Sequence, residues 1–224
     1  MIKDNIKRIQ EEIYEAALHC GRKPEEITLC AVTKTVDALK AQEVLNAGVG
    51  VLGENRVQAL LEKYEVLKDR PEWHLIGHLQ TNKVKYIADK VSLIHSVESI
   101  KLAEEINKKA KACGKIQDIL VEVNVAGEES KFGIRPEETE SFIEQISSLE
   151  NICVRGLMTI APFPEQKGEN RKYFSKLREL FVDIQSKKYD NSNIDILSMG
   201  MSRDYVDAIY EGATIVRIGT ALFN

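Results

Sequence analysis

Eight short apolar runs alternate with helical segments along this chain, and their order constrains the fold more than any other feature. The runs are rich in β-branched residues, which is typical of strands buried on both faces of a parallel sheet. They cover residues 27–33, 51–53, 73–77, 93–96, 118–125, 153–160, 194–199 and 214–218. Helical patterns fit between them at 37–48, 56–68, 82–89, 99–112, 136–149, 168–188 and 203–211.

One more helical pattern precedes the first run, with Ile2, Ile6, Ile9 and Ile13 at helical spacing. This count and order predict an α/β fold, a (β/α)8 TIM barrel with one extra N-terminal helix, built as a single domain over residues 1–224. A doubly wound open sheet is the alternative. Such a sheet usually carries G-x-G-x-x-G after its first strand, and Val32-Thr-Lys-Thr35 does not match that turn, so we favour the barrel.

The charge and cysteine patterns exclude several classes of protein. The net charge is −4, with acidic and basic residues well mixed, so we expect no nucleic-acid partner. No apolar run is long enough to cross a membrane, and the N-terminal residues lack the pattern of a signal peptide. The four cysteines are widely spaced without C-x-x-C, which predicts neither a metal site nor disulfides. We therefore expect a cytoplasmic protein with no membrane partner.

The last two runs both end in small polar residues, which suggests an anion site. Ile196-Leu-Ser-Met-Gly-Met-Ser202 and Thr214-Ile-Val-Arg-Ile-Gly-Thr-Ala-Leu-Phe223 each break into Gly, Ser or Thr. Such residues expose backbone N–H groups to an anion, and Ser202 is placed to cap the following helix. A barrel builds its usual phosphate site from these same two loops. Arg217, inside the second run, would be a buried cation beside the pocket.

Lys34 follows the first run, where barrel strands end and functional side chains gather. One interpretation is a lysine that extends to solvent. The other is an amine that forms a Schiff base, favoured in its neutral form by desolvation or a nearby cation such as Arg217. An aldehyde-accepting lysine, a phosphate pocket and a fixed cation together fit pyridoxal 5′-phosphate (PLP). A Schiff-base aldolase acting on a phosphorylated sugar would use the same lysine and phosphate site.

Seven motifs in order, spread almost from end to end, resemble the pyridoxal phosphate homeostasis proteins, single-domain relatives of the N-terminal barrel of alanine racemase. The motifs are Ala31-Val-Thr-Lys34, Gly53-Glu-Asn55, His74-Leu-Ile-Gly-His-Leu-Gln-Thr-Asn-Lys83, Val123-Asn-Val with Lys131-Phe-Gly133, Gly156-Leu-Met-Thr-Ile-Ala-Pro162, Ser198-Met-Gly-Met-Ser-Arg-Asp204 and Val216-Arg-Ile-Gly-Thr-Ala-Leu-Phe223. One departure is Asn224, where the family usually has Gly; Asn also tolerates left-handed backbone angles.

The resemblance implies a role for each candidate residue. It implies that Lys34 bonds the aldehyde, that Arg217 faces the pyridine nitrogen, and that Ser202, Gly219 and Thr220 hold the phosphate. Asn55 and Met201 would line the ring. For His78 a place in the pocket wall and a purely structural role stay open.

The resemblance also implies a carrier that stores, buffers or delivers PLP rather than an enzyme. Arginine does not give up its proton, so Arg217 would leave the ring a weak electron sink. A PLP-dependent amino-acid racemase is the alternative, but it needs bases on both faces of its substrate. In alanine racemase the second base is a tyrosine from another domain and subunit, which we do not expect here; Tyr205 and Tyr210 fit outer packing better. We expect a monomer, with PLP-requiring apo-enzymes as candidate recipients.

Overall fold

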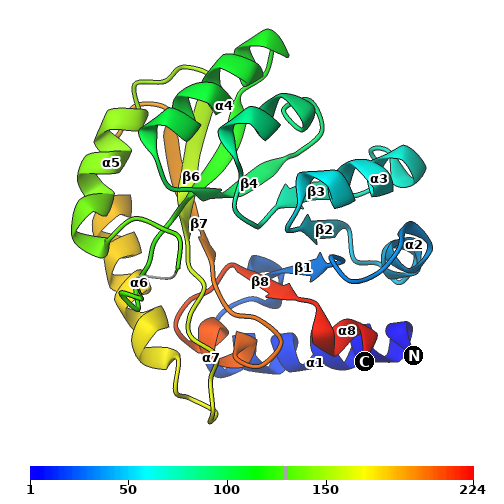
Figure 1. The fold of residues 1–224 in the computed structure, drawn as a ribbon. Helices are drawn as coiled ribbons and strands as arrows, with labels where there is room; N and C mark the ends of the chain where they lie inside the picture. Colours follow the sequence, from blue (N-terminus) through cyan, green and yellow to red (C-terminus); the bar gives the residue numbers. More distant parts are fainter. Residues whose placement is uncertain (129–130) are drawn as a thin grey trace.

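The computed structural model describes residues 1–128 and 131–224, and its eight parallel strands form a closed barrel in chain order (Figure 1). All eight predicted strands are confirmed. They are β1 (Thr28–Val32), β2 (Val51–Glu54), β3 (Glu72–Leu75), β4 (Leu93–Val97), β5 (Gln117–Glu122), β6 (Ile152–Met158), β7 (Ser192–Ser198) and β8 (Ile215–Ile218). The open-sheet alternative is thereby excluded, because β8 pairs directly with β1.

The helices surround this barrel on its outside (Figure 1). They are α1 (Ile2–His19), α2 (Ala38–Asn46), α3 (Val57–Leu67), α4 (Ile100–Ala112), α5 (Thr139–Ile146), α6 (Arg171–Gln185), α7 (Tyr205–Tyr210) and α8 (Thr220–Phe223), with 3-10 turns η1 (Pro24–Glu26), η2 (Thr81–Tyr86) and η3 (Pro136–Glu138). Asp37 and Ser99 cap α2 and α4 as their sequences indicate, by accepting from the amides of Lys40 and Leu102.

Two helical predictions need correction. The segment predicted as a helix at 82–89 contains the 3-10 helix η2 instead, in which Val84 is the buried residue. The last strand, for which no helix was predicted, is followed by the single turn α8.

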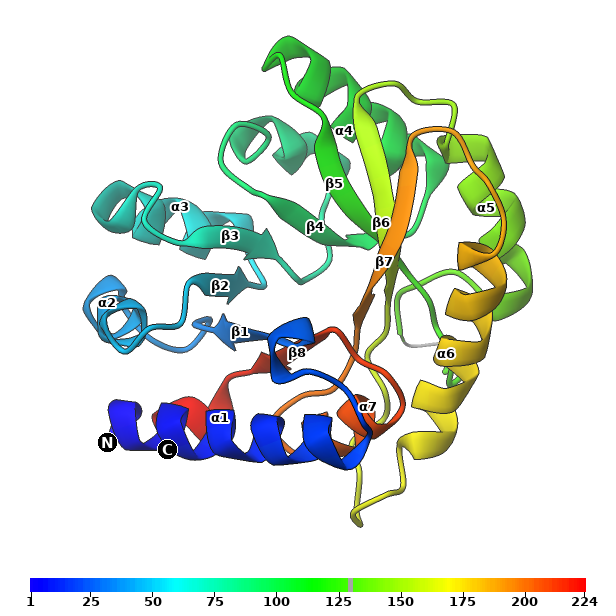
Figure 2. The same ribbon diagram turned by 180° about the vertical axis from the view of Figure 1, so that it is seen from behind.

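The N-terminal helix takes the place of a full-length eighth barrel helix. α1 packs against α2, α7 and α8, and Figure 2 shows it running along β1 and β8 with the two chain ends close together. The Asn5 side chain donates to the backbone oxygens of Leu222 and Asn224, both at 3.0 Å. The N-terminal helix α1 therefore covers the outer side of β8 and β1, for which the single turn α8 is too short.

Alternation along the strands decides which side chains face the barrel interior. Cys30, Val32, Leu120, Met158 and Ile215 belong to a separate interior cluster, whereas their strand neighbours pack outward against the helices. Continuing the same alternation places Arg217 on the interior side of β8 and Glu122 on that of β5. Lys34, two residues beyond Val32, lies in the turn that follows β1, and its side chain is exposed.

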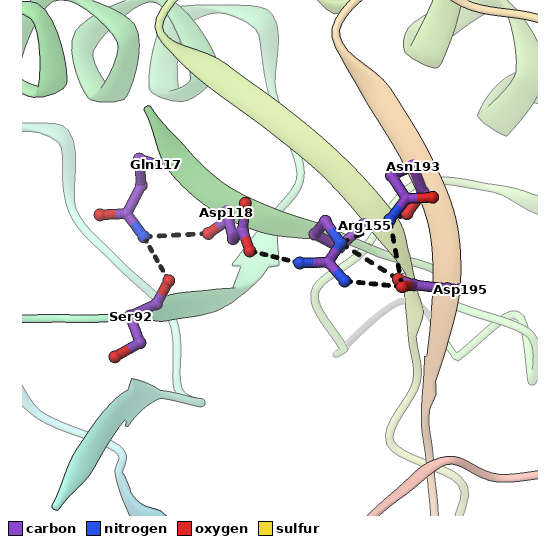
Figure 3. A network of polar contacts seen from close by, with 6 residues as sticks. All are labelled: Ser92, Gln117, Asp118, Arg155, Asn193 and Asp195. Atoms are coloured by element: carbon purple, nitrogen blue, oxygen red, sulfur yellow. Dashed lines mark hydrogen bonds and ion pairs between the residues drawn. The ribbon is translucent and has the colours of Figure 1, made fainter. Parts of the chain in front are cut away.

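A polar network joins strands in the N-terminal part of the sheet, away from the loops that follow the strands (Figure 3). Arg155 of β6 donates to Asp118 of β5 at 2.6 Å and to both carboxylate oxygens of Asp195 of β7 at 3.1 and 2.6 Å. Gln117 donates to the backbone oxygens of Ser92 and Asp118. These contacts fix strand register; chemistry in this fold collects at the opposite end of the strands.

Candidate functional site

The loops after β7 and β8 meet at Ser202. Its Oγ accepts from the amides of Gly219 and Ala221, both at 3.3 Å. The prediction that Ser202 caps the following helix is wrong, because α7 begins only at Tyr205, with Asp204 as its N-cap. Asp204 Oδ1 accepts from the Met201 amide at 2.6 Å and so holds residues 201–204 in a turn before the helix. Ser202 instead binds the N-terminus of α8 and joins the two predicted phosphate loops.

These loops carry backbone donors that are available to a ligand. Within residues 1–128 and 131–224, the amides of Ser202, Arg203 and Thr220 have no hydrogen-bond acceptor. The Ser202 oxygen already accepts two amides, so its own hydroxyl proton is left to donate. Gly200 allows this geometry: it has φ +89°, and a Cβ there would lie 2.5 Å from Ala208 Cβ. The arrangement suits a phosphate, which has several acceptor oxygens.

Arg217 is a buried cation, 3% exposed, with its guanidinium held by neutral groups. Its Nη1 donates to Ser198 Oγ at 2.5 Å and its Nη2 to the Thr159 backbone oxygen at 2.8 Å. Burial lowers the pKa of Arg217, but the group remains protonated because arginine titrates far above neutral pH. It can therefore donate to an acceptor at the barrel mouth but cannot supply a proton to it.

Two histidines extend this contact across the barrel interior. His95 Nδ1 lies 3.0 Å from Ser198 Oγ, and His95 Nε2 lies 3.0 Å from His74 Nδ1. Because Ser198 accepts from Arg217, its hydroxyl proton points to His95 Nδ1, and His95 then donates through Nε2 to His74. Burial lowers the pKa of His95 well below its usual range and that of His74 to about 4, so both rings are neutral. This chain of hydrogen bonds fixes the orientation of the Arg217 guanidinium.

Lys34 lies in the turn after β1 with an exposed side chain, and within residues 1–128 and 131–224 it forms no hydrogen bond or ion pair. Its neighbour Thr33 is firmly held. Thr33 Oγ1 donates to Glu54 at 2.5 Å, and Lys63 of α3 donates to Glu54 at 2.6 Å and to the Thr33 backbone oxygen at 2.9 Å. Among the described residues the Lys34 amine is therefore unpaired, while the backbone next to it is fixed by the contacts of Thr33.

Asn55 and His78 line a pocket of about 550 Å³ beside the mouth. Its other lining residues are Arg56, Val57, Gln58, Leu61, Gln80, Lys83 and Tyr86. His78 Nδ1 lies 2.9 Å from Glu98, and the His78 ring stacks on Phe132 with 4.0 Å between centroids. His78 thus contributes to this pocket wall, while Ser202, Gly219 and Thr220 lie on the loops of β7 and β8.

Glu122 was not among the residues singled out from sequence. It faces the interior of β5, is 4% exposed, and its Oε2 has no hydrogen-bond partner among the described residues. Burial, reinforced by Glu98 and opposed by Arg217, raises the pKa of this carboxyl to about 7. The one available signal was a glutamate at an inward position of an apolar strand.

The remaining polar candidates are structural. The Tyr205 hydroxyl donates to Glu12 of α1 and the Tyr210 ring packs on His19, which confirms outer packing for both tyrosines. All four cysteines are free. In the described part of the chain no cluster of His, Cys, Asp and Glu side chains suits a metal ion. No described helix has the length and hydropathy of a membrane span.

Comparisons with known proteins agree with the fold described above. Residues 2–224 match the family described as alanine racemase, N-terminal domain. The pyridoxal phosphate homeostasis protein of Aquifex aeolicus is 49% identical over 99% of this chain and 96% of its own. A structure of PipY from Synechococcus elongatus with PLP bound has a TM-score of 0.86 at 31% identity, covering 100% of both chains. A crystal structure of an unknown protein from Bifidobacterium adolescentis has a TM-score of 0.94 at 37% identity, covering 99% of this chain and 94% of its own.

Proposed function

Since the chain belongs to the family of pyridoxal phosphate homeostasis proteins, we propose that it binds PLP and stores, buffers or delivers the cofactor, and thereby acts indirectly on amino-acid and keto-acid metabolism. The observation that carries the proposal is the Ser202 hydroxyl, which joins the amide-bearing loops of β7 and β8 into one anion site. Arg217 lies on the interior side of β8, and Lys34 lies in the turn that follows the adjoining strand β1.

The polar groups of the barrel mouth fit the substituents of PLP. The Ser202 hydroxyl and the amides of Arg203 and Thr220 would hold the phosphate, and Gly219 brings the second loop against Ser202. Arg217 would donate to the pyridine nitrogen, and Lys34 supplies a primary amine for the aldehyde. Asn55 and Met201, both half-buried at strand ends, would line the ring. When bound, PLP supplies a reactive aldehyde and an electron-withdrawing ring.

The residues of the site favour binding of the cofactor over catalysis with it. Arg217 keeps its proton, so the ring nitrogen would stay unprotonated and the ring a weak electron sink. Tyr205 and Tyr210 are engaged with α1 and are not placed as an opposing base. These features support a carrier rather than a racemase or transaminase.

We also propose PLP-requiring apo-enzymes as the recipients and a cytoplasmic monomer as the working state. Phe132, Ile160 and Phe163 are exposed in the loops after β5 and β6, at the mouth through which the cofactor would leave. These side chains would be available to a recipient protein at the rim. The free cysteines fit a reducing compartment.

The phosphate is expected to provide much of the affinity. Pyridoxal, which lacks the phosphate, should bind far more weakly than PLP in a spectroscopic titration. Ser202→Ala removes a donor to a charged group, for which about 1.5–3 kcal/mol is typical, or roughly a 10- to 150-fold loss in PLP affinity. Ser148→Ala, an exposed serine after α5, is the control and should change nothing. Equal affinity for pyridoxal and PLP would rule out this phosphate site.

The PLP-loaded protein is expected to show no meaningful racemase or transaminase turnover. The measurement is deuterium exchange at the α-carbon, followed with optical rotation, over a panel of amino acids. Slow exchange without inversion fits one base acting on one face of the substrate. Rapid inversion of any amino acid would overturn the carrier assignment in favour of an enzyme.

A further inference from the structure

Glu122 is the one buried carboxyl inside the barrel wall, among the described residues, whose side chain forms no hydrogen bond or ion pair. It is 4% exposed and follows Leu120, which belongs to the interior cluster. Across the pairing of β5 with β6 its neighbour is Met158, another member of that cluster. An unpaired buried carboxyl is costly for the folded protein, so its retention suggests a ligand partner.

Asn124, two residues beyond the end of β5, does not compete for this role. The Asn124 side chain is already engaged, donating to the Glu128 backbone oxygen at 2.8 Å and accepting from the Gly127 amide at 3.0 Å. Glu122 is therefore the last residue on the interior side of β5 with a free polar group. Strand β8 presents Arg217 to the same interior space, and each charge affects the pKa of the other group.

The proposed site so far assigns no hydrogen-bond donor to one polar substituent of PLP, the 3-hydroxyl. The aldehyde, the phosphate and the ring nitrogen are accounted for by β1, the loops of β7 and β8, and Arg217. The 3-hydroxyl flanks the aldehyde-bearing carbon on the side away from the phosphate arm. The phosphate loops follow β7 and β8, and β5, which only β6 separates from β7, contributes Glu122 to the same barrel interior.

We propose that Glu122 binds the 3-oxygen of PLP as a neutral carboxylic acid that donates a hydrogen bond, an inference that rests on the proposed function. The 3-oxygen of bound PLP carries negative charge, which a protonated carboxyl stabilises and a carboxylate repels. The site would thereby recognise all four polar substituents of the cofactor.

The protonation state follows from the groups that face Glu122. Glu98, in the connection from β4 to α4, adds negative charge, β8 contributes Arg217, and β6 contributes the apolar Met158. Burial is the largest effect, and the pKa of Glu122 rises to about 7. Below this value the acid is neutral and donates; above it the carboxylate faces the 3-oxygen. PLP affinity should therefore fall as the pH rises through about 7.

The test compares two ligands in three proteins: PLP and 3-deoxypyridoxal 5′-phosphate, in the wild type, Glu122→Leu and Glu122→Gln. Glu122→Leu should lower the affinity for PLP roughly 10-fold or more, as expected for the loss of a hydrogen bond to a charged group. The affinity for the 3-deoxy analogue should be unchanged. Glu122→Gln keeps a neutral donor, so it should match the wild type at pH 6 and bind PLP more tightly at pH 8.5. Glu104→Gln, an exposed carboxyl on α4, is the matched control.

Two further readouts separate a binding role from a structural one. The absorption maximum of the bound cofactor should shift in Glu122→Leu, and the melting temperature of the ligand-free variant should be equal to or above that of the wild type. Equal losses for both ligands, or a lowered melting temperature with no ligand discrimination, would overturn the inference while leaving the carrier proposal intact. Failure of the wild type to bind PLP at all would instead contradict the proposed function itself.

Discussion

Lys63→Met is expected to lower the free energy of unfolding by about 3–5 kcal/mol, the typical cost of removing one partner of a buried ion pair. Lys63 is 5% exposed and Glu54 is 0% exposed, with 2.6 Å between Lys63 Nζ and Glu54 Oε1. Glu54 Oε2 already has no hydrogen-bond partner among the described residues, so the variant would leave this carboxylate buried with only Thr33. Methionine fills most of the volume of the lysine stem, which limits any cavity.

Denaturant unfolding of the ligand-free protein measures this effect. Lys68→Met at the end of the same helix is the matched control, because Lys68 forms an exposed pair with Glu65 at 2.9 Å and should lose at most about 1 kcal/mol. The double variant Glu54→Gln/Lys63→Met should recover part of the loss, since it removes both charges. An unfolding free energy for Lys63→Met no lower than that for Lys68→Met would contradict the assignment. PLP affinity should also fall, because Lys63 anchors the residue that precedes Lys34.

Lys34→Ala is expected to abolish covalent retention of PLP while leaving the fold unchanged. Lys34 is exposed and, in the part of the chain that the structure describes, forms no hydrogen bond or ion pair, so its removal should alter stability by no more than about 0.5 kcal/mol. The phosphate loops and Arg217 remain in the variant and should still bind PLP weakly and reversibly. Thermal unfolding tests whether the fold and its stability are unchanged. Loss of the bound cofactor on gel filtration tests whether covalent retention is abolished.

Much of the fold could be predicted because barrel strands and their helices are encoded locally. The apolar runs identified all eight strands, and the chain order implied the closed barrel. Errors arose where distant contacts decide the boundary. The helix predicted from residue 168 begins at Arg171, because the Gly168 amide donates to Asp207 and the Asn170 side chain donates to Asp204 and Pro162. No local pattern reveals such partners.

The same distinction holds for the site. Loop residues with a chemical signature, such as Lys34 and Ser202, could be named from sequence, and the structure brings the phosphate loops together at Ser202. The buried residues that hold Arg217 could not be named from sequence, because their roles depend on strands that meet only in the barrel. His95 on β4 reaches Arg217 through Ser198 of β7. Lys63 was detectable in principle, as a lysine on the apolar face of α3 between Leu60 and Leu67.

The most direct test of the central claim is to locate the cofactor on the chain. The purified protein is loaded with PLP, reduced with borohydride, digested, and its peptides are mapped by mass spectrometry. The site described here predicts a single main pyridoxyl adduct on Lys34, absent in Lys34→Ala. A main adduct on Lys83 or Lys131, or no adduct with the wild type, would contradict it.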